Sequence, residues 1–196
     1  ERRVGEVADA LEDIGAETGR LGRLVDDLLL LARSDSGAVS LERLPVDLGA
    51  IAEEAVATMA KLAAERGVTV GVRVEPCLVE GDAARLRQLV GNLLDNAIRH
   101  APPRGHVWLQ VGGDGSGVEL VVEDDGPGIR PEHLPRLFDR FWRAPGAPGE
   151  GSGLGLAIAA WIVERHGGRI VAANRPEGGA RFSVWLPRLA VPAAAR

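Results

Sequence analysis

The chain has 196 residues, 45% of them hydrophobic and 26% charged, which is typical of one globular domain with an appendage. Its net charge of −5 excludes broad electrostatic binding of nucleic acid, and no apolar run approaches the roughly 20 residues of a membrane span. Cys77 is the only cysteine, which excludes an internal disulfide and a cysteine-built zinc site.

The first 37 residues carry a helical repeat. Mostly apolar residues recur at 3-4-3-4 spacing from Val4 to Ala32, and further leucines widen the stripe near its end. A stripe this wide suits a four-helix bundle, so we expect a partner helix that this chain lacks. The opening residues do not resemble a signal peptide and read as the interior of a longer protein.

The rest of the chain alternates hairpins with helices. After a break at 34–40, the sequence predicts a short extended stretch, a helix at 48–67, a strand at 68–75, and a short strand and turn at 77–82. A helix at 82–102, capped by Asp82, and a hairpin at 105–126, with its turn at 112–117, are predicted next. A glycine- and proline-rich stretch at 125–151, a helix at 154–168 and a hairpin at 169–187 follow. Because no parallel βαβ array is present, the predicted fold class is α+β.

One face of the helix at 82–102 is polar. Asn92 and Asn96 are four residues apart, and Arg99 and His100 follow on the same side. A carboxamide oxygen suits Mg²⁺, and a cation nearby would offset phosphate charge. By itself, this pattern also fits an ordinary solvated surface.

Glycines precede the helix at 154–168. Gly149, Gly151, Gly153 and Gly155 would let the backbone approach a ligand, and a helix N-terminus attracts phosphate. The spacing matches neither a P-loop nor a Rossmann fingerprint.

The stretch "DDGPGI" ends a predicted strand. Taken alone it is ordinary turn chemistry. However, a buried carboxylate at Asp124 would need a hydrogen-bond donor, which an adenine amino group could supply, and Gly126 and Gly128 would let the base lie against the backbone.

The order of these motifs, with "LFDRFWRA" before the glycines and "GGARF" after them, resembles the ATP-binding domain of sensor histidine kinases. That superfamily is shared with gyrase, mismatch-repair and heat-shock chaperone ATPases. The resemblance covers residues 38–188, and residues 1–37 resemble the second helix of the family's dimerization and phosphotransfer hairpin. It implies a two-layer sandwich with a mixed, mostly antiparallel sheet, and a division into 1–37, a catalytic domain at 38–190 and a tail at 191–196.

The resemblance implies that ATP and Mg²⁺ bind this chain. Asn96 would bind the metal, with Asn92 as a second contact to metal or phosphate, and Asp124 would accept from the adenine amino group. A lid at 130–150 would be anchored by Phe138 and Phe141. The residues implied to contact nucleotide are Asn92, Asn96, Arg99, His100, Asp124, Gly126, Gly128, Ile129, Arg140, Arg143, Gly151, Gly153, Leu154 and Gly155.

Four positions depart from the family pattern. Arg99 replaces a lysine, His100 and Trp142 each stand where tyrosine is common, and Ala180 replaces a threonine. The alanine puts one water-mediated adenine contact in doubt, but not the pocket.

The chemistry expected from the resemblance is phosphoryl transfer to histidine. Relatives that hydrolyse ATP carry a glutamate base four residues before the metal asparagine, where Asn92 cannot accept a proton. None of the four histidines lies in the family's acceptor motif, so this fragment of a protein-histidine kinase is expected to bind ATP without phosphorylating itself. The alternatives are a serine kinase of the anti-sigma type on the same fold, or a non-catalytic ATP-binding and dimerization module.

The resemblance also implies partners and a location. The full-length protein is expected to form a homodimer through the N-terminal helix, to act on a response regulator, and to be anchored in the membrane. This fragment itself is expected to be cytoplasmic, with no contact to membrane or nucleic acid.

Other conspicuous side chains have structural interpretations. Trp108, Trp161 and Trp185 alternate with apolar residues and are predicted to lie in the core. His166 is predicted to cap a helix end or interact with its dipole, and Cys77 to be a small packing residue.

Overall fold

The computed structural model describes residues 15, 18–19, 21–22, 24–33, 40–113, 116–145 and 152–189. The chain divides into two compact units, Glu1–Ser40 and Leu41–Arg196. None of the helices within the described ranges is long and apolar enough to cross a membrane.

The first unit is helical at every described position up to residue 33. This confirms the predicted helix for that part of the chain, while the seam positions before residue 15 lie outside the described residues. Leu21, Val25 and Leu28 are exposed, at 52%, 53% and 39%. They belong to the predicted apolar stripe.

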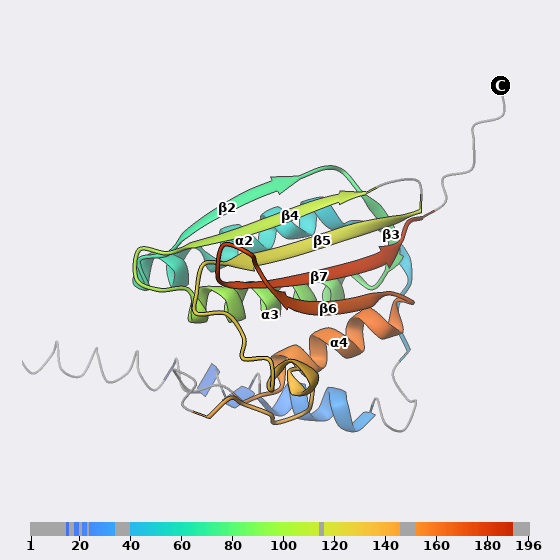
Figure 1. Ribbon diagram of the computed structural model, residues 1–196. Coiled ribbons are helices and arrows are strands. Elements are labelled where there is room, and N and C mark those ends of the chain that lie inside the picture. The colour runs from blue at the N-terminus through green and yellow to red at the C-terminus, as the bar shows by residue number, and fades with distance from the viewer. Residues whose placement is uncertain are drawn as a thin grey trace, which may run out of the picture. The chain divides into compact units, whose positions relative to one another are not determined.

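The second unit is built on a five-stranded sheet (Figure 1). Its strands, in spatial order, are β2 (Thr69–Val74), β4 (His106–Gly113), β5 (Gly117–Asp124), β7 (Ala180–Pro187) and β6 (Arg169–Asn174). The pair β2–β4 is parallel and the other pairs are antiparallel. β1 (Leu44–Asp47) and β3 (Leu78–Gly81) form a separate antiparallel pair. The predicted α+β fold with a mixed, mostly antiparallel sheet is therefore confirmed.

Three helices cover one face of the sheet, as Figure 1 shows. They are α2 (Leu48–Glu65), α3 (Ala83–His100) and α4 (Gly155–Arg165). Asp47 and Asp82 cap α2 and α3 by accepting from N–H groups of their first turns, as predicted for Asp82. Leu89, Leu93 and Ala97 of α3 are fully buried, so the opposite side of α3 is left for polar residues.

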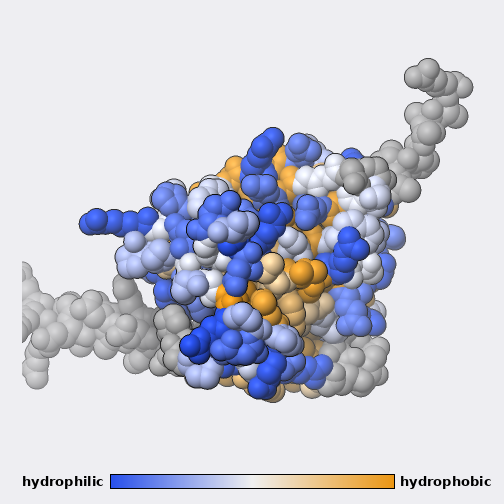
Figure 2. Space-filling model, viewed as in Figure 1, coloured by the Kyte–Doolittle hydropathy of each residue, from blue (hydrophilic) through white to orange (hydrophobic). Residues whose placement is uncertain are grey.

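Among the described residues of the second unit, no helix covers the opposite face of the sheet (Figure 1), and here two predictions are wrong. Trp108 and Trp185 are only half-buried and point to this outer face, because their strand neighbours Leu109 and Leu186 fill the core. Arg175 lies over the Trp108 ring, 4.6 Å from its centroid. Figure 2 looks onto this face, with hydrophilic side chains over much of it and hydrophobic ones gathered near β6.

Two smaller expectations also change. Trp161, on α4, is half-buried rather than in the core. The β4–β5 turn is shorter than predicted, because the glycines at 112, 113 and 117 belong to the strands.

Cys77 is buried, which confirms the predicted packing role, and burial raises the pKa of its thiol.

His166 joins the end of α4 to the start of α3. It is 3% exposed; its Nδ1 lies 2.7 Å from the Ile162 carbonyl, and its Nε2 accepts from the Asp82 N–H at 3.0 Å. Nδ1 must therefore carry the proton of a neutral ring. Burial lowers the pKa of this imidazole, so the ring is neutral. Its contact with the Ile162 carbonyl confirms the capping role predicted at the end of α4, whereas the alternative charge–dipole role is wrong.

His166 makes stability depend on pH. The unfolded chain binds a proton at this ring more readily than the folded chain, so the free energy of unfolding falls as the pH drops through the ordinary histidine range. We expect His166→Gln, whose side-chain oxygen can still accept from Asp82, to flatten this dependence. Urea unfolding between about pH 5 and 8 measures it.

The control is Gln110→Ala, an exposed position on the outer face of β4 whose substitution removes no titratable group. The control should keep the wild-type dependence. His100, whose pKa is also lowered by burial, contributes in the same direction, so part of the dependence should remain in the variant at position 166. An unchanged dependence in that variant would contradict the role assigned to the ring.

Candidate functional site

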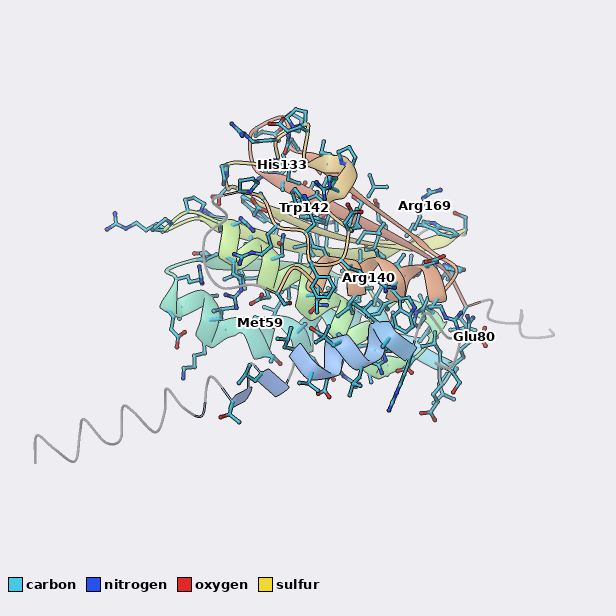
Figure 3. The ribbon with its side chains drawn as sticks, turned by 90° about the horizontal axis from the view of Figure 1, so that it is seen from below. Met59, Glu80, His133, Arg140, Trp142 and Arg169 are labelled. Carbon is cyan, nitrogen blue, oxygen red and sulfur yellow. The ribbon has the colours of Figure 1, made fainter. Side chains whose placement is uncertain are left out.

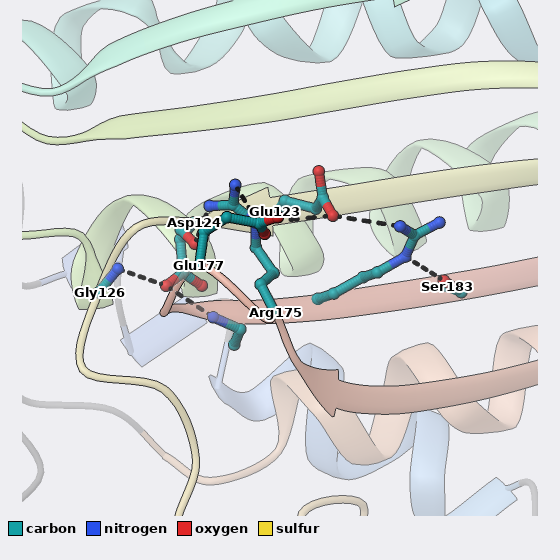
Figure 4. Close-up of polar contacts among 8 residues, drawn as sticks. Glu123, Asp124, Gly126, Arg175, Glu177 and Ser183 are labelled. Atoms are coloured by element: carbon teal, nitrogen blue, oxygen red, sulfur yellow. Dashed lines mark hydrogen bonds and ion pairs between the residues drawn. The ribbon is translucent and has the colours of Figure 1, made fainter.

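Asp124, the last residue of β5, is a buried carboxylate with one unsatisfied oxygen (Figure 4). It is 1% exposed, and its Oδ1 accepts from the N–H groups of Gly126 at 2.9 Å and Ala180 at 3.2 Å. Its Oδ2 is buried with no hydrogen-bonding partner among the described residues. Burial raises the pKa of this carboxyl, although the two backbone hydrogen bonds oppose the shift. Such an oxygen is suited to accept from a ligand.

The glycines after Asp124 are required by protein contacts as well as by any ligand. A Cβ on Gly126 would collide with the carbonyl of His100. Gly128 has φ +74°, and a Cβ there would lie 2.8 Å from Oδ1 of Asn174. The His100 carbonyl belongs to the backbone, and the Asn174 amide is held by two hydrogen bonds to Ile129, so displacing either group would cost stability. The "DGPGI" loop is therefore held close to α3 and to β6.

The polar face of α3 meets the beginning of α4. Asn92 donates from Nδ2 to the Gly155 carbonyl at 3.0 Å, so Oδ1 is the atom it could offer to a ligand. Asn96 is half-buried and has no side-chain hydrogen bond to the described residues. Arg99 is paired with Asp95, its Nε lying 2.6 Å from a carboxylate oxygen. Arg99 would have to exchange this partner to bind a phosphate.

His100 lies at the end of α3, close to the charge of Asp124. Burial lowers the pKa of its imidazole, the Asp124 charge opposes this, and the charges of Arg66, Arg99 and Arg143 add to the lowering. The ring is therefore neutral at neutral pH, and it can hydrogen-bond or stack without bringing a charge.

The beginning of α4 has the features of an anion site. Leu154, its N-cap, makes no side-chain hydrogen bond to the first turn, so the helix N-terminus keeps donors for a ligand. Gly153 has φ +70°, and a Cβ there would lie 2.7 Å from the backbone of Phe141. Gly149 and Gly151, predicted to belong to the same cradle, lie outside the described residues.

The segment between β5 and α4 contains a short 3-10 helix, Leu134–Arg136, and an aromatic cluster. Figure 3 shows His133 and Trp142 close together, and their ring centroids are 5.2 Å apart in an edge-on contact. Phe141 donates its N–H to the Gly153 carbonyl at 3.0 Å, but its side chain is 61% exposed. Phe141 is thus not the anchor that the sequence predicts, whereas Phe138 is half-buried. Arg140 and Arg143 are exposed residues of this segment.

Sequence reasoning missed the contribution of the β6–β7 turn. Arg175 donates to the Asp124 carbonyl at 3.0 Å, and Asn174 hydrogen-bonds the backbone of Ile129. Ala180, noted for its missing threonine hydroxyl, contacts Asp124 through its backbone N–H instead. The only signal in the sequence was the "GGARF" motif, which contains Gly179 and Ala180 but not the two polar residues before it.

Residues 81–190 match the family described as histidine kinase-, DNA gyrase B-, and HSP90-like ATPase. This chain belongs to that family. Within it, the chain contains the ATP-binding catalytic domain of the sensor histidine kinases, as the named relatives below indicate.

The relatives share most of this kinase domain. It is 39% identical to the signal transduction histidine-protein kinase BaeS of Escherichia coli (strain K12) over 183 residues, which is 91% of this chain and 39% of that protein. The mycobacterial sensor histidine kinase MprB has a solved structure with TM-score 0.67 and 33% identity, covering 74% of this chain and 97% of that one. For full-length ShkA in complex with AMPPNP, the TM-score is 0.76 and the identity 30%, covering 90% and 38%. The chain thus spans about two fifths of its curated relatives.

In the described part of the catalytic domain, the side chains that could bind a cation such as Mg²⁺ at this site are amides rather than a cluster of carboxylates. Within the part of the chain that the structure describes, no group of three or more His, Cys, Asp or Glu side chains lies close enough to hold a metal ion. The carboxamide of Asn96 has no hydrogen-bond partner among the residues that the structure describes. A single amide oxygen suits Mg²⁺, which takes few protein ligands and completes its shell with phosphate oxygens and water.

The unsatisfied oxygen of Asp124 gives a direct prediction. Asp124→Asn replaces an anionic acceptor with an amide whose donor would face a donor on the base, so ADP affinity should fall by about tenfold to a hundredfold. Because burial raises the pKa of this carboxyl, its charge costs folding free energy at neutral pH, and the variant should unfold at the same or a higher temperature. Calorimetric titration and thermal unfolding measure the two effects.

The adjacent carboxylate supplies the control. Asp125 accepts from the His106 N–H, and its side chain is 31% exposed, so Asp125→Asn should leave ADP affinity nearly unchanged. Equal affinities for the wild type and the variant at position 124 would show that Asp124 does not bind the base.

Proposed function

We propose that this chain binds Mg–ATP and transfers the γ-phosphoryl group to a histidine outside the chain, as the catalytic part of a two-component sensor kinase. The observation that carries the proposal is the buried, unpaired Oδ2 of Asp124. An exocyclic amino group of adenine is a donor that would satisfy it, whereas the carbonyl oxygen of guanine would repel it. The family to which the chain belongs binds ATP through this type of domain.

The phosphate groups would extend from Asp124 toward α3 and the glycine-rich beginning of α4. This direction is supported by the contact between Asn92 and Gly155, which brings the polar face of α3 to the helix N-terminus. Asn96, with Asn92 beside it, would hold Mg²⁺, which when bound neutralises charge on the phosphates. Further nucleotide contacts are proposed for Arg99, His100, Gly126, Gly128, Ile129, Arg140, Arg143, Gly151, Gly153, Leu154 and Gly155.

Transfer to a side chain is favoured over hydrolysis because, among the described residues, no general base lies beside the proposed metal ligand Asn96. Asn92 is an amide, and its Nδ2 is committed to the Gly155 carbonyl. Asp95, the nearest carboxylate along the helix, is ion-paired to Arg99 at 2.6 Å. Neither group is placed to take a proton from water.

The acceptor would be supplied by the rest of the protein. Of the four histidines, His166 is buried and committed to two hydrogen bonds, and none has an acceptor motif around it. We infer that residues 1–37 are the second helix of a dimerization hairpin, followed by the catalytic domain at 38–190 and a tail at 191–196. The full-length protein would then be a membrane-anchored homodimer whose catalytic part faces the cytoplasm and whose phosphoryl group passes to a response regulator.

The role of Asn96 can be isolated through magnesium. In Asn96→Ala, ATP affinity in the presence of Mg²⁺ should fall by about tenfold, while affinity in excess chelator should stay near the wild-type value, because only the metal ligand is lost. Titrations of ATP under both conditions measure this difference.

Gln110→Ala, on the outer face of β4, is the control and should behave as the wild type does. A parallel loss of affinity with and without Mg²⁺ in Asn96→Ala would assign this residue to the nucleotide rather than to the metal.

Phosphotransfer can be tested by supplying the missing acceptor. The chain alone with Mg–ATP should stay unlabelled, and a separate hairpin domain carrying the acceptor histidine of a relative should become labelled from γ-labelled ATP. Phosphohistidine is acid-labile, so the label should disappear after acid treatment. A hairpin with glutamine at the acceptor position is the control.

The competing functions give different outcomes. Acid-stable label on a serine would point to a serine kinase of the anti-sigma type. Tight ATP binding without transfer to any hairpin would point to a non-catalytic module.

A further inference from the structure

The side chain of Asn174, at the end of β6, hydrogen-bonds both the backbone N–H and the backbone carbonyl of Ile129. Its Oδ1 accepts from the Ile129 N–H at 2.6 Å, and its Nδ2 donates to the Ile129 carbonyl at 2.8 Å. A carboxamide presents an acceptor and a donor side by side at any ordinary pH, whereas an ionised carboxylate offers acceptors alone. Ile129 is 45 residues away in sequence, so this is a tertiary contact between the β6–β7 turn and the loop after Asp124.

The loop after Asp124 has a glycine where the Asn174 amide approaches its backbone. Gly128 has φ +74°, which disfavours residues with a Cβ, and a Cβ built there would lie 2.8 Å from Oδ1 of Asn174. A loop that contains two glycines is also costly to order, since glycine loses the most conformational freedom. A two-point attachment at its far end is therefore needed to fix it.

The same turn also holds the near end of the loop. Arg175 donates to the Asp124 carbonyl at 3.0 Å, and Ala180 donates its N–H to Oδ1 of Asp124 at 3.2 Å (Figure 4). Arg175 is itself held by the Trp108 ring, 4.6 Å from its centroid, and by Glu123 at 3.7 Å. The segment Asp124–Ile129 is thus fixed at both ends by the β6–β7 turn.

We propose that Asn174 is a positioning residue for base recognition. By fixing Ile129 it holds the loop that carries Gly126, whose N–H occupies Oδ1 of Asp124 and leaves Oδ2 directed at the base. The proposal rests on the adenine site proposed above. Asn174 is exposed, so water can replace its hydrogen bonds after truncation, and the effect falls on loop order rather than on folding.

The test compares two ligands that differ only in the amino group. ADP and purine riboside 5′-diphosphate, which lacks the amino group, are titrated into the whole chain. In Asn174→Ala, ADP affinity should fall by about tenfold while affinity for the analogue changes little, so that the preference for ADP shrinks. The unfolding temperature without ligand should stay within a few degrees of the wild type.

Two further variants make the result specific. Asn174→Asp keeps the shape but turns an oxygen toward the Ile129 carbonyl, so it should lose the preference as Asn174→Ala does. Ser183→Ala, on the outer face of the same hairpin, should keep the wild-type preference.

The outcomes separate the two proposals. A wild-type chain that does not bind ADP, or that binds both ligands equally, would overturn the adenine site itself. A wild-type preference for ADP that survives in both variants at position 174, or equal losses for the two ligands, would overturn only the role of Asn174.

Discussion

The arrangement of the catalytic domain depends on a carboxylate that is buried with half of its hydrogen-bonding capacity unused. Backbone N–H groups from two segments hold Oδ1 of Asp124, and nothing in the described part of the protein satisfies Oδ2. An unsatisfied buried group costs about 1–3 kcal/mol of folding free energy, and more when charged. Other interactions in the fold must offset this cost. The compensation lies in the fully buried apolar layer between α3, α4 and the sheet. Stability is given up at the point where we propose that the nucleotide binds.

Distant parts of the chain converge on this carboxylate. β5 places Asp124 at its end, α3 places Asn96 and His100 on the face opposite its buried leucines, and the amide of Asn92 connects α3 to the beginning of α4. The β6–β7 turn closes the arrangement from the other side through Asn174 and Arg175. Each contact joins segments that no local pattern connects, which explains why the motifs are spread over almost 90 residues.

The elements of the fold could be predicted because periodicity and capping are local signals. Asp82, the strand alternation and the apolar periodicity were sufficient to locate α3 and the hairpins. Alternation does not say which face of a sheet is covered, so Trp108 and Trp185 were assigned to the wrong side. The sequence indicated that His166 could cap α4, but not that its Nε2 accepts from the N–H of Asp82, 84 residues away. Asn174 was missed for the same reason, since a lone asparagine before a turn is ordinary turn chemistry.

A crystal structure of the chain with ADP would show whether Asp124 receives the base. We expect the exocyclic amino nitrogen of adenine within about 3 Å of Oδ2 of Asp124, with Oδ1 still bonded to Gly126 and Ala180. A base bound elsewhere, or an Oδ2 satisfied by a protein group instead of the nucleotide, would contradict this expectation.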